Sequence, residues 1–195
     1  LDAPWGDLCA GPGGKAALLT GLARQQGVEL VAGEVAPHRA RLVARALGAY
    51  PDGWTVMVND ATAPGLATGS LSKLMADVPC TGLGSLRRRP ESRWRRTTDD
   101  LEELIALQAR ILDGCWRVLA SGGVMALVTC SPHPRETVEQ VQALLMRHDD
   151  AELLDAGDYL PDIRQAAHPQ EPRCLQLWPH RHGTDAMFGA LLRKA

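Results

Sequence analysis

Near its amino terminus the chain reads Asp7-Leu8-Cys9-Ala10-Gly11-Pro12-Gly13-Gly14-Lys15. This segment lies where an apolar run is expected to turn into a helix, and its glycines let the backbone approach a ligand closely. A phosphate-binding loop would need Gly at position 9 and Ser or Thr at position 16, where Cys9 and Ala16 stand. The dinucleotide spacing G-x-G-x-x-G is also absent. The segment predicts a cofactor cradle of another type, with an ordinary glycine-rich turn as the alternative.

Around this segment, apolar runs bounded by Gly, Pro or Asp alternate with segments of helical period. Predicted strands cover Trp5–Cys9, Glu29–Glu34, Thr55–Asn59, Leu71–Asp77 and Gly123–Thr129, and predicted helices cover Gly14–Gln26, Pro37–Leu47, Asp99–Leu119 and Arg135–His148. The third helix has candidate caps in Thr97, Thr98, Asp99 and Asp100. Leu175–Trp178 and Ala186–Leu192 are expected to form an antiparallel edge hairpin. The pattern predicts an α/β fold with a doubly wound, mostly parallel sheet.

Composition limits the class of protein. With 195 residues, of which 45% are hydrophobic, the chain fits one globular domain. Its net charge of −2 means that any affinity for nucleic acid must come from a local group of basic residues. Five cysteines without a C-x-x-C pair indicate reduced thiols in a cytoplasmic protein. The sequence shows no membrane span, no leader and no histidine spacing typical of a metal site, so we expect no membrane and no metal.

An acidic residue follows the glycine-rich segment at an informative distance. Glu34 ends the next predicted strand, 20 residues beyond Gly14. A carboxylate there can accept hydrogen bonds from both hydroxyls of a ribose, which favours a nucleoside cofactor. A solvated strand end is the alternative for Glu34.

Two cysteines also follow predicted strands. The chain reads Asp77-Val78-Pro79-Cys80-Thr81-Gly82 after one strand and Thr129-Cys130-Ser131-Pro132 after another. Open α/β sheets bind ligands at the carboxyl ends of their strands. A single cysteine in such a place is more often a small buried hydrophobic residue. The pair, together with the cradle, favours a nucleophilic site.

Three runs of this sequence carry a resemblance to a known family. The runs are DLCAGPGGK, DVPCTGLG followed by LRRRPESRW, and VTCSPHPRETVEQV. They resemble the signature motifs of the Sun/Fmu (RsmB/NSUN) family of RNA 5-methylcytosine methyltransferases, and the bacterial 16S ribosomal RNA branch is the most similar. The final LQLWPHRHGTDAMFGALLRK also resembles the last strand pair of that family. Val78, Gly11 and Ala16 depart mildly from the usual pattern.

The resemblance implies a Rossmann-like class I methyltransferase fold, with residues 1–195 as the catalytic domain. Family members carry an upstream RNA-binding region that this chain lacks, so the chain is expected to be part of a longer polypeptide. The implied reaction moves a methyl group from S-adenosylmethionine to carbon 5 of a cytosine in RNA. Carbon 5 is a poor nucleophile until a thiolate adds to carbon 6.

The resemblance also assigns roles to individual residues. Cys130 is the expected attacking thiol, and Cys80 is expected to assist breakdown of the covalent adduct. Asp77 is expected to bind or protonate the ring at nitrogen 3, with a pKa that rises when the base excludes water. Apart from the resemblance, a free thiol is only slightly ionised at pH 7, so Lys15 and nearby amides are expected to favour the Cys130 thiolate.

The cofactor is expected to lie along the same sheet edge. The resemblance places its methionine end on the loop Cys9, Ala10, Gly11, Pro12, Gly13, Gly14 and Lys15. The ribose is expected on Glu34, the adenine near Asp60 and the reactive methyl near Asp77, with a contribution from Arg39. For Asp60 the alternative is a turn-forming residue before Ala61-Thr62-Ala63-Pro64.

A basic segment follows Cys80. It contains Arg87, Arg88, Arg89, Arg93, Arg95 and Arg96, with Trp94 among them. Guanidinium groups bind phosphates, and an indole can pack against the fold or stack on a base, so the segment is a candidate RNA-binding surface. The alternative is a solvated loop whose charges are balanced by Asp99, Asp100, Glu102 and Glu103. The expected partner is ribosomal RNA that is unpaired at the target base.

Two other functions remain open at the level of sequence. A non-catalytic RNA-binding or ribosome-assembly module could keep the same fold, and binding of S-adenosylmethionine would separate it from an enzyme. Methylation of an exocyclic amine would not need two cysteines. The Asn/Asp-Pro-Pro-aromatic loop that would suit an amine is absent from the sequence.

Overall fold

The computed structural model describes residues 3–195, which fall into two compact units. The first unit comprises the residues up to Asp77 together with Ile111–Met125 and Lys194–Ala195. The second comprises Val78–Arg110 and Ala126–Arg193. The long helix α4 (Thr98–Val118) and the strand β5 (Leu119–Thr129) contribute residues to both units.

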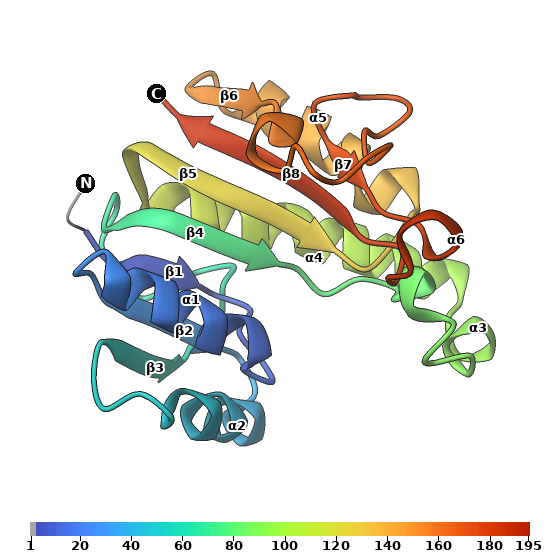
Figure 1. Ribbon diagram of the computed structural model, residues 1–195. Helices are drawn as coiled ribbons and strands as arrows, with labels where there is room; N and C mark the ends of the chain where they lie inside the picture. Colours follow the sequence, from blue (N-terminus) through green and yellow to red (C-terminus); the bar gives the residue numbers. More distant parts are fainter. Residues whose placement is uncertain (1–2) are drawn as a thin grey trace. The chain divides into compact units, whose positions relative to one another are not determined.

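The first unit is built on parallel strands (Figure 1). They are β1 (Trp5–Asp7), β2 (Leu30–Glu34), β3 (Trp54–Val58) and β4 (Leu71–Asp77). Strand β1 pairs in parallel with both β2 and β4, and β3 pairs in parallel with β2. Crossover helices α1 (Gly14–Gln25) and α2 (Pro37–Leu47) connect the first three strands. The carboxyl ends of these strands carry the glycine-rich loop, Glu34 and Asp77, as parallel strands require.

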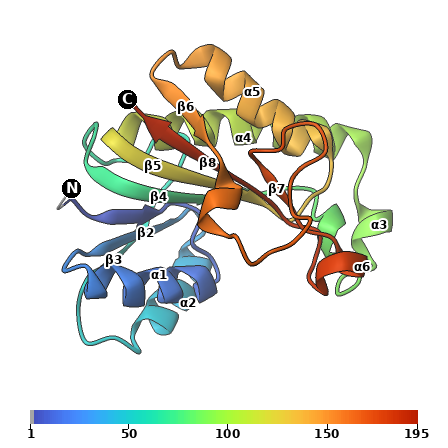
Figure 2. The ribbon, with the colours of Figure 1, turned by 45° about the horizontal axis from the view of Figure 1, so that its top comes forward.

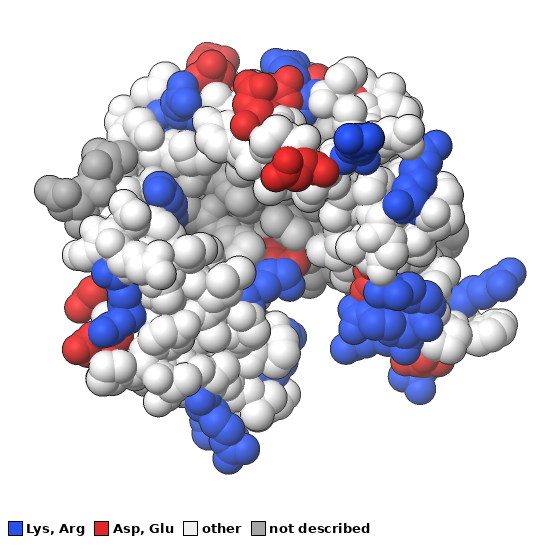
Figure 3. Space-filling view, viewed as in Figure 1, with Lys and Arg blue, Asp and Glu red and all other residues white. Residues whose placement is uncertain are grey.

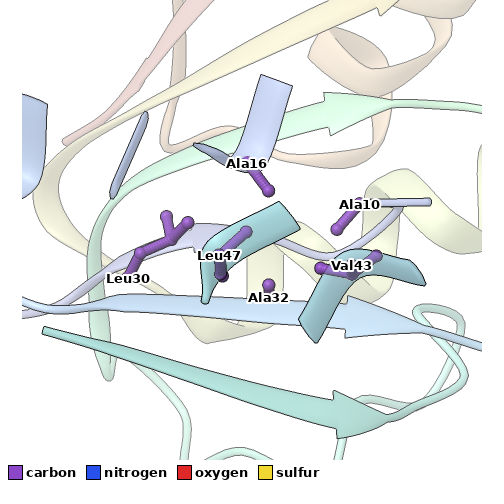
Figure 4. Packing of buried hydrophobic residues seen from close by; sticks show 6 residues of the cluster. All are labelled: Ala10, Ala16, Leu30, Ala32, Val43 and Leu47. Atoms are coloured by element: carbon purple, nitrogen blue, oxygen red, sulfur yellow. The ribbon is translucent and has the colours of Figure 1, made fainter. Parts of the chain in front are cut away.

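Small and branched apolar side chains fix the loop against the sheet. Figure 4 shows a cluster of Ala10, Ala16, Leu30, Ala32, Val43 and Leu47. All six side chains are buried, and they come from the loop, α1, β2 and α2. Because Ala10 belongs to this cluster, the path of the glycine-rich loop is set by the packing of the core and not by the loop alone.

The second unit follows β4 and contains short elements. They include α3 (Ser92–Arg95), α5 (Val138–Arg147), β6 (Ala151–Leu154), β7 (Leu175–Gln176), α6 (Pro179–His182) and β8 (Phe188–Lys194). Short 3-10 helices lie at Leu83–Ser85, Pro134–Glu136 and Ala156–Tyr159. Figure 2 shows α5 beside β6, which it contacts. Strands β7 and β8 are antiparallel, with Gln176 opposite Phe188.

The strand order confirms the expected fold class. The strands follow the order β3-β2-β1-β4-β5-β8-β6, with β7 paired to β8. This is a mostly parallel α/β sheet of the Rossmann-like type with an antiparallel carboxyl-terminal pair. In this order β8 lies between β5 and β6, so the outermost strand on that side is β6, which the sequence pattern did not predict.

Most element boundaries agree with the predictions within one or two residues, and the exceptions have local causes. Strand β5 begins at Leu119 instead of Gly123. A Cβ at Gly123 would lie 2.9 Å from the Ser72 carbonyl oxygen, so this glycine permits a close backbone approach inside the strand. The predicted helix at Arg135–His148 is divided, because Pro134–Glu136 forms a 3-10 turn and Thr137 leaves the helical region at φ −130°.

The start of α4 is capped as predicted. The Asp100 carboxylate accepts hydrogen bonds from the backbone N–H of Thr97 at 2.8 Å and from its hydroxyl, while the Thr97 hydroxyl accepts from the Asp100 N–H at 3.2 Å. This reciprocal arrangement is a capping box.

Within residues 3–195, none of the helices combines the length and apolar character needed to pass through a lipid bilayer.

Candidate functional site

The glycine-rich loop is held at the end of β1 by backbone contacts. The Ala10 N–H donates to the Gly33 carbonyl at 2.9 Å, and the Ala17 N–H donates to the Gly13 carbonyl at 2.9 Å as α1 begins. Gly13 has φ 114°, and a Cβ there would lie 3.0 Å from the Val43 Cα. Position 13 therefore requires glycine, because both its backbone angle and the nearby helix α2 exclude a side chain.

The loop borders a cavity of about 290 Å³. Its lining residues are Asp7, Cys9, Ala10, Gly11, Pro12, Gly14, Lys15 and Asp77. Six of the seven predicted loop residues thus face this cavity together with Asp77, while Gly13 packs against α2. The sequence reasoning missed Asp7 as a site residue, although it is the last residue of β1 and leads directly into the loop.

Glu34 and Arg39 support the loop from the neighbouring strand and helix. The Arg39 guanidinium donates to the Gly11 carbonyl at 2.7 Å and lies 3.4 Å from the Glu34 carboxylate. The other oxygen of Glu34 accepts from the Ala36 N–H at 3.0 Å. A Cβ at Gly11 would lie 2.1 Å from the Glu34 Oε2 atom, so glycine at position 11 leaves the space that the Glu34 carboxylate occupies.

These features fit the nucleoside cofactor that the sequence predicts. Glu34 is 3% exposed, yet its carboxylate lies against the loop backbone at Gly11, where it can accept hydrogen bonds from hydroxyl groups. The cavity beside the loop adds the Asp7 and Asp77 carboxyl groups, which can accept from an ammonium group. Glycines that leave no room for a Cβ, as at positions 11 and 13, are typical of a loop whose backbone approaches a ligand closely.

Asp7 has unusual electrostatics. Burial raises the pKa of its carboxyl to about 7, the negative charge of Asp77 adds to the rise, and the hydrogen bond from the Cys9 N–H opposes it. Burial also raises the pKa of the Cys9 thiol to about 12, and the nearby Asp7 charge acts in the same direction. Cys9 therefore stays protonated near neutral pH, and it lines the cavity without being a candidate nucleophile.

The structure brings two of the predicted catalytic residues together. Lys15 Nζ donates to Asp77 Oδ2 at 2.7 Å, from the first turn of α1 to the end of β4. The Asp77 side chain is only a quarter exposed, so the ammonium group fixes a carboxylate that faces the cavity. That Lys15 favours ionisation of the Cys130 thiol stays a prediction.

At Asp60 the structure matches the turn-forming alternative. One carboxylate oxygen accepts from the Thr62 N–H at 2.8 Å and from the Thr62 hydroxyl at 2.7 Å. This geometry is an Asx turn. A contact between Asp60 and an adenine ring stays a prediction.

In the second unit the two predicted catalytic thiols meet. Cys80 Sγ and Cys130 Sγ lie 3.3 Å apart, both residues are half-buried, and neither forms a disulfide. The hydrogen bond with Cys130 and burial both raise the pKa of the Cys80 thiol above its usual range. Cys80 therefore stays protonated and can donate its S–H to the Cys130 sulfur.

The basic segment is exposed and partly anchored. All six arginines are exposed, and Trp94 is 77% exposed, so its indole is not part of the core. Arg87 and Arg88 both bind the buried carboxylate of Asp185, and their hydrogen bonds hold its pKa at about 2. Figure 3 shows a group of Lys and Arg side chains on the side where Figure 1 places α3.

Not all of the acidic residues predicted to balance the charges of this segment contact its arginines. Asp100 lies 3.9 Å from Arg96, whereas Glu102 binds Arg135 with two hydrogen bonds. The sequence reasoning missed Asp185, which is 98 residues from Arg87 along the chain.

Nowhere in residues 3–195 do three or more His, Cys, Asp or Glu side chains form a group that could hold a metal ion.

Comparisons with known proteins identify the family of this chain. The sequence profile of the family described as 16S rRNA methyltransferase RsmB/F matches residues 2–193. "Putative methyltransferase Rv1407" from Mycobacterium tuberculosis is 46% identical over 97% of this chain and 40% of its own length. Ribosomal RNA small subunit methyltransferase B from Pectobacterium carotovorum is 36% identical over 96% of this chain and 41% of its own length.

A solved structure has a similar fold. The crystal structure of PH0851 superposes with a TM-score of 0.87 and 29% identity, over 99% of this chain and 43% of that one. The chain thus spans about two fifths of the curated relatives it matches. From the loop, the thiol pair, the strand order and these similarities together, the chain belongs to the 16S rRNA methyltransferase RsmB/F family.

Proposed function

We propose that this chain is the catalytic part of an enzyme that methylates carbon 5 of a cytosine in RNA, with 16S ribosomal RNA as the substrate. The observation that carries the proposal is the distance of 3.3 Å between Cys80 Sγ and Cys130 Sγ. Simple transfer of a methyl group to an amine or a hydroxyl needs no thiol, whereas activation of carbon 5 needs a nucleophile at carbon 6. Family membership supports RNA as the substrate class.

Cys130 is the proposed nucleophile. Its thiolate adds to carbon 6 of the ring, which makes carbon 5 electron-rich. After carbon 5 has gained the methyl group it loses its proton to a base, and the bond between sulfur and carbon 6 then breaks to restore the aromatic ring. Cys80, whose raised pKa keeps it protonated, is suited to donate a hydrogen bond to the Cys130 sulfur and so to assist its departure.

S-adenosylmethionine is the proposed cofactor, and when bound it supplies an electrophilic methyl group. The loop Cys9–Lys15 would hold its methionine end and Glu34 its ribose, with Arg39 supporting both through Gly11 and Glu34. Asp77 is the proposed partner of ring nitrogen 3, and Lys15 orients its carboxylate. Asp60 is the proposed neighbour of the adenine.

RNA is proposed to bind through the exposed arginines of residues 87–96 and Trp94. Because Arg87 and Arg88 are already tied to Asp185, the other four arginines are the stronger candidates for phosphate contacts. A separate RNA-binding region of the same polypeptide is proposed to add substrate affinity, and the expected location is the cytoplasm.

The test is methyl transfer to ribosomal RNA by the purified protein and two variants. Cys130→Ala should abolish transfer while S-adenosylmethionine still binds in calorimetry. Cys80→Ala should accumulate a protein–RNA adduct that survives denaturing gels. An active Cys130→Ala protein would refute the covalent mechanism, and wild-type protein that binds RNA but not S-adenosylmethionine would favour the non-catalytic module.

A further inference from the structure

Glu136 is a buried carboxylate beside the thiol pair, and the mechanism above does not use it. It ends the 3-10 helix that follows the Cys130 loop, and its relative exposure is 0%. Its Oε1 atom accepts from the Thr81 N–H at 2.8 Å and from the Gln108 amide at 3.1 Å. Its Oε2 atom accepts from the Thr81 hydroxyl at 2.5 Å and from the Ser131 hydroxyl at 2.6 Å.

These hydrogen bonds connect the two cysteine loops. Thr81 directly follows Cys80, and Ser131 directly follows Cys130, so one side chain is bonded to the neighbour of each thiol. A carboxylate offers about four acceptor positions, which these four donors fill. Burial of a carboxylate carries a large desolvation cost, and an apolar side chain would fill the same space at lower cost. The arrangement is therefore better explained by a positional role than by packing.

Other contacts hold the same two loops. The Gln108 amide that binds Glu136 also donates to the Pro79 carbonyl at 2.9 Å, and the Gly84 N–H donates to the Cys130 carbonyl at 2.9 Å. A Cβ at Gly84 would lie 2.0 Å from the Ala186 carbonyl oxygen, so the backbones approach closely there. The backbone on both sides of Cys80 is thus tied to α4 or to Glu136.

We propose that Glu136 is a positioning residue that holds Cys80 and Cys130 at the distance the reaction needs. The inference rests on the proposed function for its effect on catalysis, although the geometry it concerns exists without RNA. Glu136→Ala leaves the Thr81 N–H without its acceptor and leaves the Gln108 amide with the Pro79 carbonyl alone. Glu136→Gln keeps the shape and the acceptor on one side, and the two hydroxyls can rotate to accept from its amide.

For catalysis we expect the turnover rate to fall while the affinity for the cofactor stays the same. A displacement of about 1 Å at a reacting group can cost on the order of 100-fold in rate, so kcat should fall by about that factor in Glu136→Ala and less in Glu136→Gln. The KM for S-adenosylmethionine should stay unchanged, because the cofactor loop belongs to the other unit. A matched control is Glu139→Gln, which changes an exposed carboxylate near the start of α5.

The decisive readout is the rate at which diamide oxidises Cys80 and Cys130 to a disulfide without RNA, followed by peptide mass spectrometry. Loss of hydrogen bonds to a charged group should slow this rate about tenfold in Glu136→Ala, with Glu136→Gln intermediate and Glu139→Gln equal to wild type. Wild-type rates in folded Glu136→Ala would overturn the proposal.

Two further arms keep the test decisive. If Glu136→Ala fails to fold, Glu136→Gln and Ser131→Ala carry the test, because the latter removes one of the four hydrogen bonds. Wild-type disulfide rates in both would overturn the proposal. If the wild-type protein methylates no cytosine, the proposed function fails, while the disulfide rates still decide whether Glu136 positions the thiols.

Discussion

Replacement of Asp7 by Asn should change how stability depends on pH. Asp7 is 1% exposed, and burial raises the pKa of its carboxyl from an ordinary 3.8 to about 7. A carboxyl whose pKa is higher in the folded chain than in the unfolded chain binds a proton on folding. The free energy of unfolding therefore falls as the pH rises from about 4 to about 7, and the loss is complete above that range.

The size of the effect follows from the two pKa values. Each pH unit between them is worth about 1.36 kcal/mol, so an ionised Asp7 costs the fold about 4 kcal/mol above pH 7. About 3 kcal/mol of that loss should appear between pH 5 and pH 8. Asn at this position carries no charge, and its amide oxygen can still accept from the Cys9 N–H, so Asp7→Asn should lack this loss.

Urea unfolding at pH 5 and pH 8 measures how the free energy of unfolding of Asp7→Asn and of the wild-type protein depends on pH. The stability of Asp7→Asn relative to wild type should rise by about 3 kcal/mol between the two pH values. Asp149→Asn, which changes an exposed aspartate, should show no such rise. An Asp7→Asn variant whose relative stability is the same at both pH values would refute the assignment of a raised pKa to Asp7.

Two other changes follow from local geometry. Gly11→Ala should weaken S-adenosylmethionine binding in calorimetry by about tenfold or more, because its Cβ would lie 2.1 Å from the buried Glu34 carboxylate and crowding of this kind costs about 1–3 kcal/mol. Gly65→Ala is the control, since its Cβ would meet nothing within 4 Å, and equal affinities would contradict the cradle. Trp94→Ala should leave the melting temperature unchanged, because the indole is 77% exposed, yet weaken RNA binding by about tenfold through lost stacking. Unchanged RNA affinity in a filter-binding titration would count against a role for Trp94.

Much of the fold could be predicted because its signals are local. The change from strand period to helix period marks the parallel strands, and the Thr97 to Asp100 spacing marks the start of α4. Strand β6 escaped prediction because four residues, Ala151–Leu154, carry too short a pattern to separate it from a loop. Glycine usually marks the end of a strand, and at Gly123 it instead permits close backbone approach.

The part of the candidate site that could be predicted consists of motifs that stand at the ends of strands. The loop, Asp77 and the two cysteines all follow strands, so parallel topology alone suggests their grouping at sheet ends. Asp7 was missed although it ends strand β1, whereas Glu136 and Asp185 could not be predicted in the same way. Their roles depend on burial and on partners distant in sequence, such as Thr81 for Glu136 and Arg88 for Asp185, and no local pattern encodes those contacts.

The covalent role of Cys130 can be measured directly with RNA that carries 5-fluorocytosine at the target position. Fluorine at carbon 5 cannot leave as a proton does, so the bond between sulfur and carbon 6 should persist after methyl transfer. Peptide mass spectrometry of the wild-type protein, incubated with this RNA and S-adenosylmethionine, should find the nucleotide on the peptide that contains Cys130. A stable adduct on the Cys80 peptide, or methylated RNA without any adduct, would contradict the account.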